Sequence, residues 1–181
     1  MSEVTVVRDT GVVAHRLELG DPRYPELGFV LDYWTRLRGP RFAPPRREID
    51  PAGLKPVLPR ITLVRVNADK SFCFGLAGTG LYALHNMEIA RKAIDDMRPA
   101  AYRDLLNAHY AEVVRTKAPN SYEIVFTTHD GLRRQYASLR VPLSDDGENV
   151  TGLLTIDNFG EGWKDLKPYF DRLYDRGTKS P

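Results

Sequence analysis

Hydrophobic and polar positions repeat at two different periods along this chain, and the changes of period divide it into strands and helices. Phe72, Phe74 and Leu76 recur at every second position, and the run then breaks into closely spaced glycines. A period of two is typical of a strand, and glycine permits backbone angles that a Cβ forbids. The pattern therefore predicts a strand, a turn and a helix from residue 72 onward.

Five segments have the alternation or the apolar content of strands. Turn-forming residues separate the first two segments from each other, and likewise the last three, so we expect antiparallel hairpins. The predicted strands are Ile61–Val66, Ser71–Ala77, Ser121–Thr128, Leu132–Leu143 and Asn149–Asn158.

Apolar residues recur at spacings of three and four in the predicted helices. The first helix covers Pro25–Arg38. Short helical pieces between residues 79 and 97 precede a second long helix over Ala100–Lys117. A C-terminal helix is predicted over Glu161–Arg176.

These elements suggest three parts of the chain. Residues 1–22 are predicted to be a loosely attached arm, with a short edge strand at Val4–Val7 or Val12–His15. Residues 23–160 form the domain, including its N-terminal helix. Residues 161–181 form the C-terminal helix and a polar tail.

Size and composition indicate one domain with a sizeable core, because the 181 residues are 42% hydrophobic and 28% charged. The N-terminus lacks the order of a secretory signal, and the single cysteine, Cys73, cannot form an internal disulfide. No apolar run approaches the roughly 20 residues that cross a bilayer. We therefore expect a cytoplasmic protein without a membrane span. The net charge of +2 gives little support to a nucleic-acid partner, and we expect none.

Charge is concentrated only in the stretch Arg36–Arg47, which holds five arginines and no acidic residue. The stretch could form a patch for anionic lipid, nucleic acid or an acidic partner. Its guanidinium groups could instead bind local carbonyls and carboxylates. We favour the second interpretation, because a proline-rich turn needs tethering.

The order of the predicted elements, two strands, helices and three strands, is that of the PAS fold. Short motifs agree with it, among them Tyr33-Trp34-x-x-Leu37-Arg38-Gly39-x-Arg41, Leu76-Ala77-Gly78-Thr79 and Val141-Pro142-Leu143. Over residues 27–160 the chain resembles a bacterial single-domain PAS family. The resemblance implies an α+β fold with a five-stranded antiparallel sheet in the order 2-1-5-4-3 and residues 79–117 across one face. Residues expected to be buried toward those helices are Phe74, Ile124, Phe126, Leu139 and Ile156.

Residue types that carry catalysis are present, but not in recognisable arrangements. The four histidines, the cysteine and the carboxylates show no metal-ligand or catalytic-triad spacing, so we expect neither an enzyme nor a metal site. His109 lies on the helix that walls a PAS cavity, where a histidine in this superfamily can bind haem. We favour instead a half-buried His109 whose ring nitrogens meet a carbonyl or water. For Cys73 we favour a packing role over a redox role.

The resemblance also implies a cavity between the sheet and the helices, suited to a small and mostly apolar ligand. Its predicted walls are Phe74, Leu76, Tyr82, His109, Phe126, Leu139 and Leu154. The leading hypothesis is a sensory or interaction module of bacterial signal transduction that binds this ligand, a partner protein, or both. No kinase, cyclase or DNA-binding segment is recognisable, so a signal would leave by contact with an unidentified partner. The alternatives are a ligand-free structural or dimerisation scaffold and, less favoured, a small enzyme with a similar cavity.

The Pro25–Arg38 helix is predicted to join two copies of the chain in a homodimer. Its apolar stripe is wider than one helix seam needs, and the outer face of an antiparallel sheet requires a cover. We expect Trp34 to anchor this helix against the sheet and Leu27 to be exposed at the dimer interface.

Overall fold

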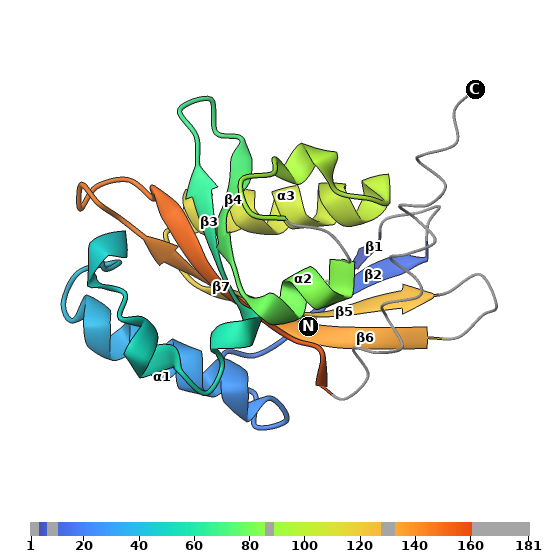
Figure 1. Ribbon diagram of the computed structural model, residues 1–181, viewed down its shortest axis with the longest axis horizontal. Helices are drawn as coiled ribbons and strands as arrows, with labels where there is room; N and C mark the ends of the chain where they lie inside the picture. Colours follow the sequence, from blue (N-terminus) through green and yellow to red (C-terminus); the bar gives the residue numbers. More distant parts are fainter. Residues whose placement is uncertain (1–3, 7–10, 86–88, 128–132, 161–181) are drawn as a thin grey trace.

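The computed structural model describes residues 4–6, 11–85, 89–127 and 133–160. In this part of the chain seven strands form one antiparallel sheet, and helices cover both of its faces (Figure 1). The strands are β1 Val4–Val6, β2 Val12–Arg16, β3 Ile61–Val66, β4 Phe72–Ala77, β5 Asn120–Thr127, β6 Arg133–Leu143 and β7 Gly152–Asn158. The α-helices are α1 Pro25–Arg38, α2 Thr79–His85 and α3 Ala100–Thr116, and the 3-10 helices are η1 Arg46–Glu48, η2 Pro51–Leu54, η3 Leu58–Arg60 and η4 Ile94–Asp96.

The strands follow the order β1-β2-β5-β6-β7-β3-β4. Read from β4, five of them run β4-β3-β7-β6-β5, which confirms the predicted order 2-1-5-4-3. The three predicted hairpins are also confirmed, since β3 pairs with β4, β5 with β6 and β6 with β7, each antiparallel. Pairing of β3 with β7 brings the first and last strands of this set together in the middle of the sheet.

Two further strands come from the N-terminal segment, which was expected to be a loosely attached arm with one short edge strand at Val4–Val7 or Val12–His15. Strands are found at both places. Residues Val12–Arg16 pair with β5 over five positions, and β1 pairs with β2 in turn. Val12 and Ala14 are fully buried. Because a strand that both pairs with an edge and buries apolar side chains is held by the sheet, this segment extends the domain instead of hanging from it.

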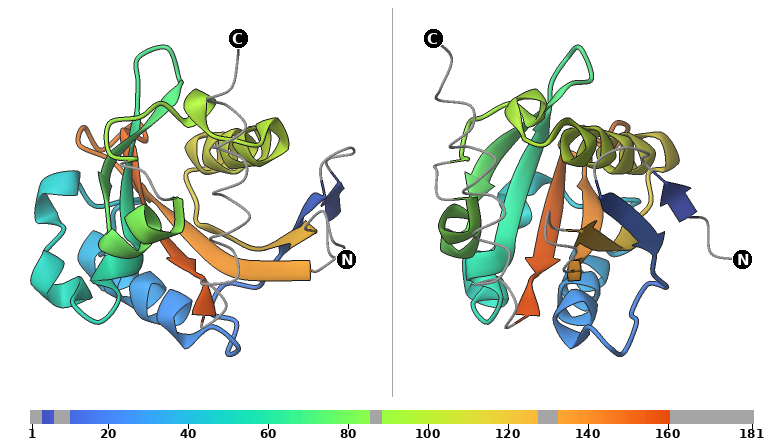
Figure 2. Two further views of the ribbon diagram at one scale, coloured as in Figure 1. Left: turned by 45° about the vertical axis from the view of Figure 1, so that its right-hand side comes forward. Right: turned by 90° about the vertical axis from the view of Figure 1, so that its right-hand side faces the viewer.

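Different helices lie on the two faces of the sheet (Figure 2), and each face has its own core. On what we call the α3 face, helices α2, η4 and α3 cover residues that include Val64, Phe72, Phe74, Leu105, Leu106, Tyr110, Ile124, Phe126 and Leu153. On the α1 face, helix α1 and the connector to β3 cover residues that include Val30, Trp34, Leu54, Ile61, Leu139, Val141, Leu154 and Ile156. The central strands therefore have no solvent face.

Register decides which residues lie on which face. Phe74, Ile124 and Phe126 lie on the α3 face, as predicted. Leu139 and Ile156 are opposite each other in the β6–β7 ladder and lie on the α1 face, so their predicted burial toward residues 79–117 is wrong. The physical reason is that successive side chains of a strand alternate, and β6 is buried on both sides, so hydrophobicity alone does not identify its inner face.

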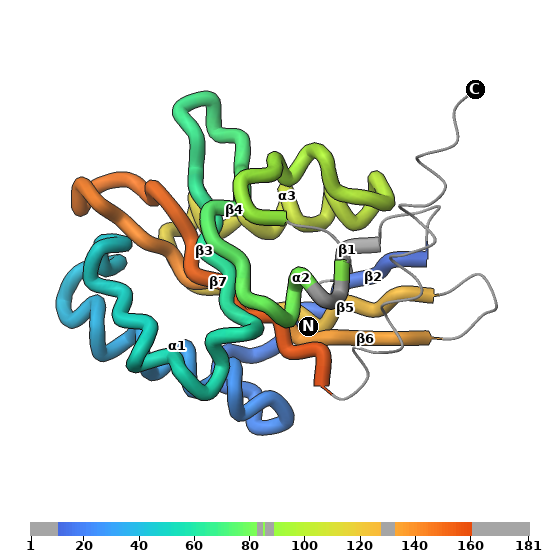
Figure 3. Tube along the Cα trace, in the orientation of Figure 1, coloured from blue at the N-terminus to red at the C-terminus, as the bar shows by residue number. Residues whose placement is uncertain are grey.

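The connector from α1 to β3 runs back along α1 (Figure 3). The Tyr33 hydroxyl accepts a hydrogen bond of 2.8 Å from the Asp50 backbone N–H, which holds the two segments together. At the far end of β4, a Cβ added to Gly78 would lie 2.3 Å from the Pro59 carbonyl oxygen. Glycine is required there by this close approach and not by a positive φ.

No helix within the described ranges is long and apolar enough to span a membrane. The predicted helix Glu161–Arg176 and the tail after it lie outside the described residues.

Candidate functional site

The seven residues predicted to wall one cavity do not meet at one place. Phe74, His109 and Phe126 are buried on the α3 face. Leu139 and Leu154 are buried on the opposite α1 face. The two remaining residues, Leu76 and Tyr82, are 51% and 57% exposed. Among the described residues, the α3 face thus holds three of the seven predicted wall residues and the α1 face holds two.

A row of four polar residues crosses the middle of the sheet on the α3 face. Thr62 of β3 is opposite Thr155 of β7, Thr155 is opposite Arg140 of β6, and Arg140 is opposite Asn120 of β5. All four are 1–2% exposed. Residues opposite each other on one face lie close together, so the four side chains form a continuous line under the helices. We call this line the polar row.

Buried polar atoms of the row and of His109 lack hydrogen-bond partners among the described residues. These atoms are Oγ1 of Thr62, Oγ1 of Thr155, Oδ1 of Asn120, the three guanidinium nitrogens of Arg140 and both ring nitrogens of His109. Native proteins pair the great majority of such atoms, and each unpaired one costs about 1–3 kcal/mol, more when it is charged. Their concentration in one place is typical of a site that binds something polar.

Arg140 is the most unusual member of the row, because it carries a charge at 1% exposure. Its guanidinium carbon lies 5.5 Å from the centre of the Tyr110 ring, which gives a cation–π contact. Burial raises the pKa of Asp157, which lies two residue pairs away along the β6–β7 ladder, and the Arg140 charge opposes that rise without reversing it. Asp157 and Arg140 nevertheless do not form an ion pair, so the guanidinium has no direct anionic partner among the described side chains.

Asp157 is held by Ser138, its opposite residue on β6. The Ser138 hydroxyl donates a 2.6 Å hydrogen bond to Asp157 Oδ1. Burial raises the pKa of Asp157, and this effect outweighs the opposing effects of Arg140 and Ser138. The buried carboxyl group is therefore easier to protonate than an ordinary aspartate, which reduces its ability to neutralise Arg140.

His109 of α3 faces the same region. Its ring stacks on the Tyr122 ring with centroids 3.7 Å apart and planes 9° apart. Burial, with smaller contributions from Arg140 and Arg16, holds the pKa of His109 well below its ordinary value, so the ring is neutral. At 3% exposure it is more buried than the half-buried histidine expected from the sequence.

A hydrogen-bond network around Glu112 fastens α3 to the sheet beside the row. The carboxylate of Glu112 accepts hydrogen bonds from Asn120 and from the Tyr122 hydroxyl, both at 2.8 Å, and forms an ion pair with Arg16 of β2. Burial alone would raise the pKa of Glu112, but these hydrogen bonds lower it below its ordinary value. The Asn120 side chain also donates to the His109 carbonyl at 2.8 Å. The N-terminal strands therefore connect to the helix that covers the site.

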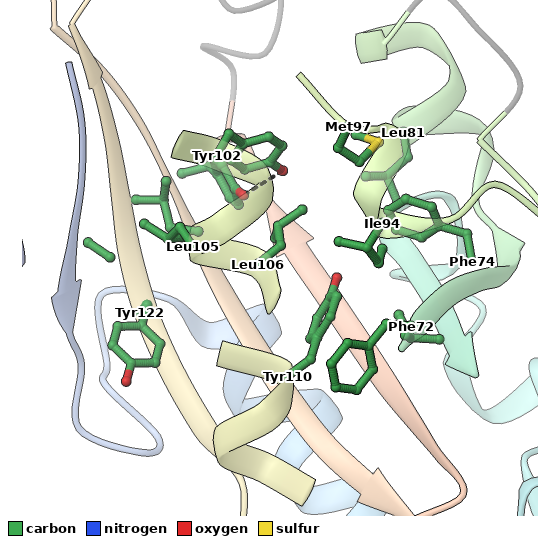
Figure 4. Packing of buried hydrophobic residues seen from close by; sticks show 14 of the residues in the cluster. Phe72, Phe74, Leu81, Ile94, Met97, Tyr102, Leu105, Leu106, Tyr110 and Tyr122 are labelled. Carbon is green, nitrogen blue, oxygen red and sulfur yellow. Dashed lines mark hydrogen bonds between the residues drawn. The ribbon is translucent and has the colours of Figure 1, made fainter. Parts of the chain in front are cut away.

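Apolar side chains border the polar row on the side of β4. The rings of Phe72 and Tyr110 meet edge to face with centroids 5.4 Å apart. Figure 4 shows Tyr110 of α3 beside Phe72, and both belong to the core cluster that also contains Ile94 and Leu106. Tyr110 thus contacts both the Arg140 guanidinium and the apolar cluster.

None of the four residues of the row was predicted as a site residue. In β6 and β7 the polar residues Ser138, Arg140, Thr155 and Asp157 alternate with apolar ones, which resembles a solvent-exposed face. The predicted helices could nevertheless have identified the row. If one helix covers each side of the sheet, the central strands have no solvent face, and the polar residues that alternate along them must be buried.

The arginine stretch Arg36–Arg47 behaves as the favoured interpretation predicted at two positions. Arg41 donates to the carbonyls of Leu37 and Arg38 and binds Glu48 through both of its terminal nitrogens at 2.8–3.0 Å. Arg38 donates to the Arg41 carbonyl at 2.9 Å. These guanidinium groups tether the turn.

Neither metal nor thiol chemistry gains support from the part of the chain that the structure describes. That part has no group of three or more histidine, cysteine or acidic residues placed to hold a metal ion. Cys73 is half-buried, and its Sγ lies 3.7 Å from the Asn67 side-chain oxygen.

Comparison with known proteins gives one family assignment. Residues 25–155 match the sequence profile of the family described as PAS domain, which covers more than two thirds of the chain. No curated protein matches the sequence.

Several solved structures are similar in fold at low sequence identity. The light-state structure of the blue-light photoreceptor Aureochrome1 LOV is 12% identical and has a TM-score of 0.41, with 70% of this chain and 96% of that chain covered. The PAS domain of a protein from Colwellia psychrerythraea is 13% identical with a TM-score of 0.41, over 61% of this chain and 98% of that one. The PAS domain of Bordetella pertussis BvgS is 14% identical with a TM-score of 0.41, over 64% and 87%.

Proposed function

The chain belongs to the PAS domain family, and from this premise we propose that it is a sensory module that binds a small ligand on the α3 face and passes the change to a partner protein through α1. PAS domains are generally sensory and non-enzymatic, and the proposed role is non-catalytic. We propose that the module acts in bacterial signal transduction in the cytoplasm, which is the hypothesis drawn from the sequence.

The observation that carries this proposal is the polar row. A core filled only for stability would contain apolar side chains at these positions, since burying unpaired polar groups in the centre of a sheet lowers stability. A ligand that hydrogen-bonds to the row would offset that cost. The apolar cluster beside Tyr110 suits the mostly apolar ligand predicted from the sequence.

A route from the ligand to α1 runs through β6. Arg140 faces the ligand side, and two residues later the Pro142 carbonyl accepts a 2.8 Å hydrogen bond from Trp34 of α1. The same helix is also fastened at its start, where Asn158 donates to Glu26 at 3.0 Å. A small displacement of β6 and β7 on ligand binding would therefore move α1 relative to its surroundings.

The proposed partner includes a second copy of the chain. Helix α1 covers its own sheet, with Trp34 buried as predicted, so the sheet face is not the interface. Leu27 is 4% exposed, which makes its predicted exposure at the interface wrong. The outer surface beside α1 offers another place, an open groove lined in part by Leu19, Leu31 and Phe42, with Leu19 48% exposed.

Native mass spectrometry of freshly purified full-length chain tests the ligand. We expect an additional mass that is lost when the protein is denatured. Thr155→Val removes one hydroxyl of the row without changing its size, and it should reduce the retained fraction. Thr35→Val makes the same change on the exposed surface of α1 and should not. A bare mass under all conditions would instead support the ligand-free scaffold.

A further inference from the structure

We infer that Arg140 binds the carboxylate of a small, otherwise apolar acid, an inference that rests on the proposed function of the same site. Nothing in the sequence pattern or the family assignment identifies this residue. It is identified by its burial, its missing hydrogen bonds and the groups around it.

The first step concerns the free-energy cost of burying the Arg140 guanidinium without hydrogen-bond partners. Its five N–H donors lie on three nitrogens, and none of these has a hydrogen-bond partner among the described residues. A charge in this position is strongly unfavourable unless an anion or other acceptors approach it. Tyr110 offers its ring face and its neutral hydroxyl oxygen, neither of which balances the charge. Asp157 is held by Ser138 and forms no ion pair with Arg140 among the described side chains.

The second step is the charge of the ligand. The planar fork of arginine matches a carboxylate or a phosphate through two parallel hydrogen bonds. A phosphate dianion needs more positive charge than one arginine supplies, and Arg16, the other arginine that acts on His109, is already paired with Glu112. One unpaired guanidinium therefore favours a monoanion.

The third step is the rest of the ligand. Tyr110 also packs against Phe72, and the same apolar cluster includes Phe74, Ile94 and Leu106. These side chains offer no charge and no hydrogen bond to a polar substituent. The hydroxyl of Thr155, which is opposite Arg140 on the row, can bind the second carboxylate oxygen, and the Thr62 hydroxyl lies next to Thr155 on the following strand. The chemistry of these side chains matches a short aliphatic or aromatic monocarboxylate.

Isothermal titration calorimetry of the full-length chain with sodium benzoate and sodium hexanoate, compared with benzamide and hexanamide, measures the expected preference. We expect at least one carboxylate to bind at least tenfold more tightly than its amide. Arg140→Met should remove this preference, and Arg140→Gln provides a polar variant if the first does not fold. Arg65→Met, the same change at an exposed position of β3, should preserve it.

Equal binding of acid and amide, or an unchanged preference in Arg140→Met, would overturn the inference. A ligand that is retained in native mass spectra equally by the wild type and Arg140→Met would overturn it while leaving the proposed sensory function standing. Binding of inorganic phosphate in preference to both carboxylates would also contradict it. If the protein retains no mass and binds no acid, the sensory proposal fails together with the inference.

Discussion

The indole nitrogen of Trp34 donates a 2.8 Å hydrogen bond to the carbonyl of Pro142, two residues along β6 from Arg140. One short stretch of strand thus contacts the polar row on one face and helix α1 on the other. Trp34 is 4% exposed, so this hydrogen bond is shielded from water and its loss would leave the indole unpaired in the core. The contact gives a direct physical connection between the candidate site and the helix proposed to report on it.

Replacing Trp34 tests how far this contact stabilises the fold. We expect Trp34→Ala to lower the free energy of unfolding by about 3–5 kcal/mol, because it removes a large buried side chain and leaves a cavity. Denaturation in urea measures the difference. Thr35→Ala, at an exposed position on the next residue, should change stability by less than about 0.5 kcal/mol. A loss for Trp34→Ala as small as that of the control would show that α1 contributes little to the core.

Two buried histidines predict that stability decreases in acid. Burial lowers the pKa of His85 from 6.5 to about 4 and holds that of His109 well below its ordinary value. The unfolded chain therefore binds protons at a higher pH than the folded protein. The free energy of unfolding should fall as the pH decreases from 6.5 toward 4, by at most about 1.4 kcal/mol per pH unit for each histidine.

His109→Phe isolates one of these contributions, because phenylalanine can stack on Tyr122 but cannot bind a proton. Urea denaturation at several pH values should give a shallower decrease below pH 6.5 for this variant than for the wild type. Thr35→Val, which changes no titratable group at an exposed position of α1, serves as the control and should keep the wild-type slope. Asp157, with its raised pKa, contributes in the opposite direction, losing stability as the pH rises. Identical slopes for wild type and His109→Phe would contradict the prediction.

The proposed homodimer predicts different outcomes for two leucines near α1. Leu19→Glu places a charge at a site that is 48% exposed, so it should separate the dimer without unfolding the chain. Leu27→Glu places the charge at 4% exposure and should unfold it. Sedimentation equilibrium together with circular dichroism distinguishes the two effects. Leu76→Glu, 51% exposed on edge strand β4, should leave the dimer intact. A wild type that is monomeric at micromolar concentration would end the dimer proposal.

If His109 bound haem, the protein would have a strong absorption band in the visible spectrum. One face of the His109 ring is already stacked on Tyr122, and the neighbouring positive charge of Arg140 suits an anion better than it suits a metal ion. We therefore expect protein expressed with iron and a haem precursor to show no strong Soret band. A strong band that disappears in His109→Ala, but persists in His15→Ala, would establish haem as the ligand and refute this expectation.

Sequence periodicity was sufficient for the order and pairing of the main elements. The turn residues between β3 and β4, and those between the last three strands, act over a few positions, so the hairpins follow from local chemistry. The spacing of apolar residues likewise predicted α1 at Pro25–Arg38, which is where it lies, and α3 to within one residue of Thr116. These are short-range signals, and the sequence contains them completely.

Only the tertiary structure decided which face each side chain occupies. Leu139 and Arg140 are adjacent, both buried, and on opposite faces, and no local rule says which one turns toward α3. The answer depends on the register between β5, β6 and β7 and on α1 covering the other side, which are contacts between residues far apart in the chain. The same long-range contacts bring Thr62, Asn120, Arg140 and Thr155 into one row. The sequence therefore determined the elements and their hairpins, whereas pairing across the sheet produced the candidate site. A one-residue change of register would turn the polar residues of the row away from α3 and bring the neighbouring apolar residues of the same strands to that face.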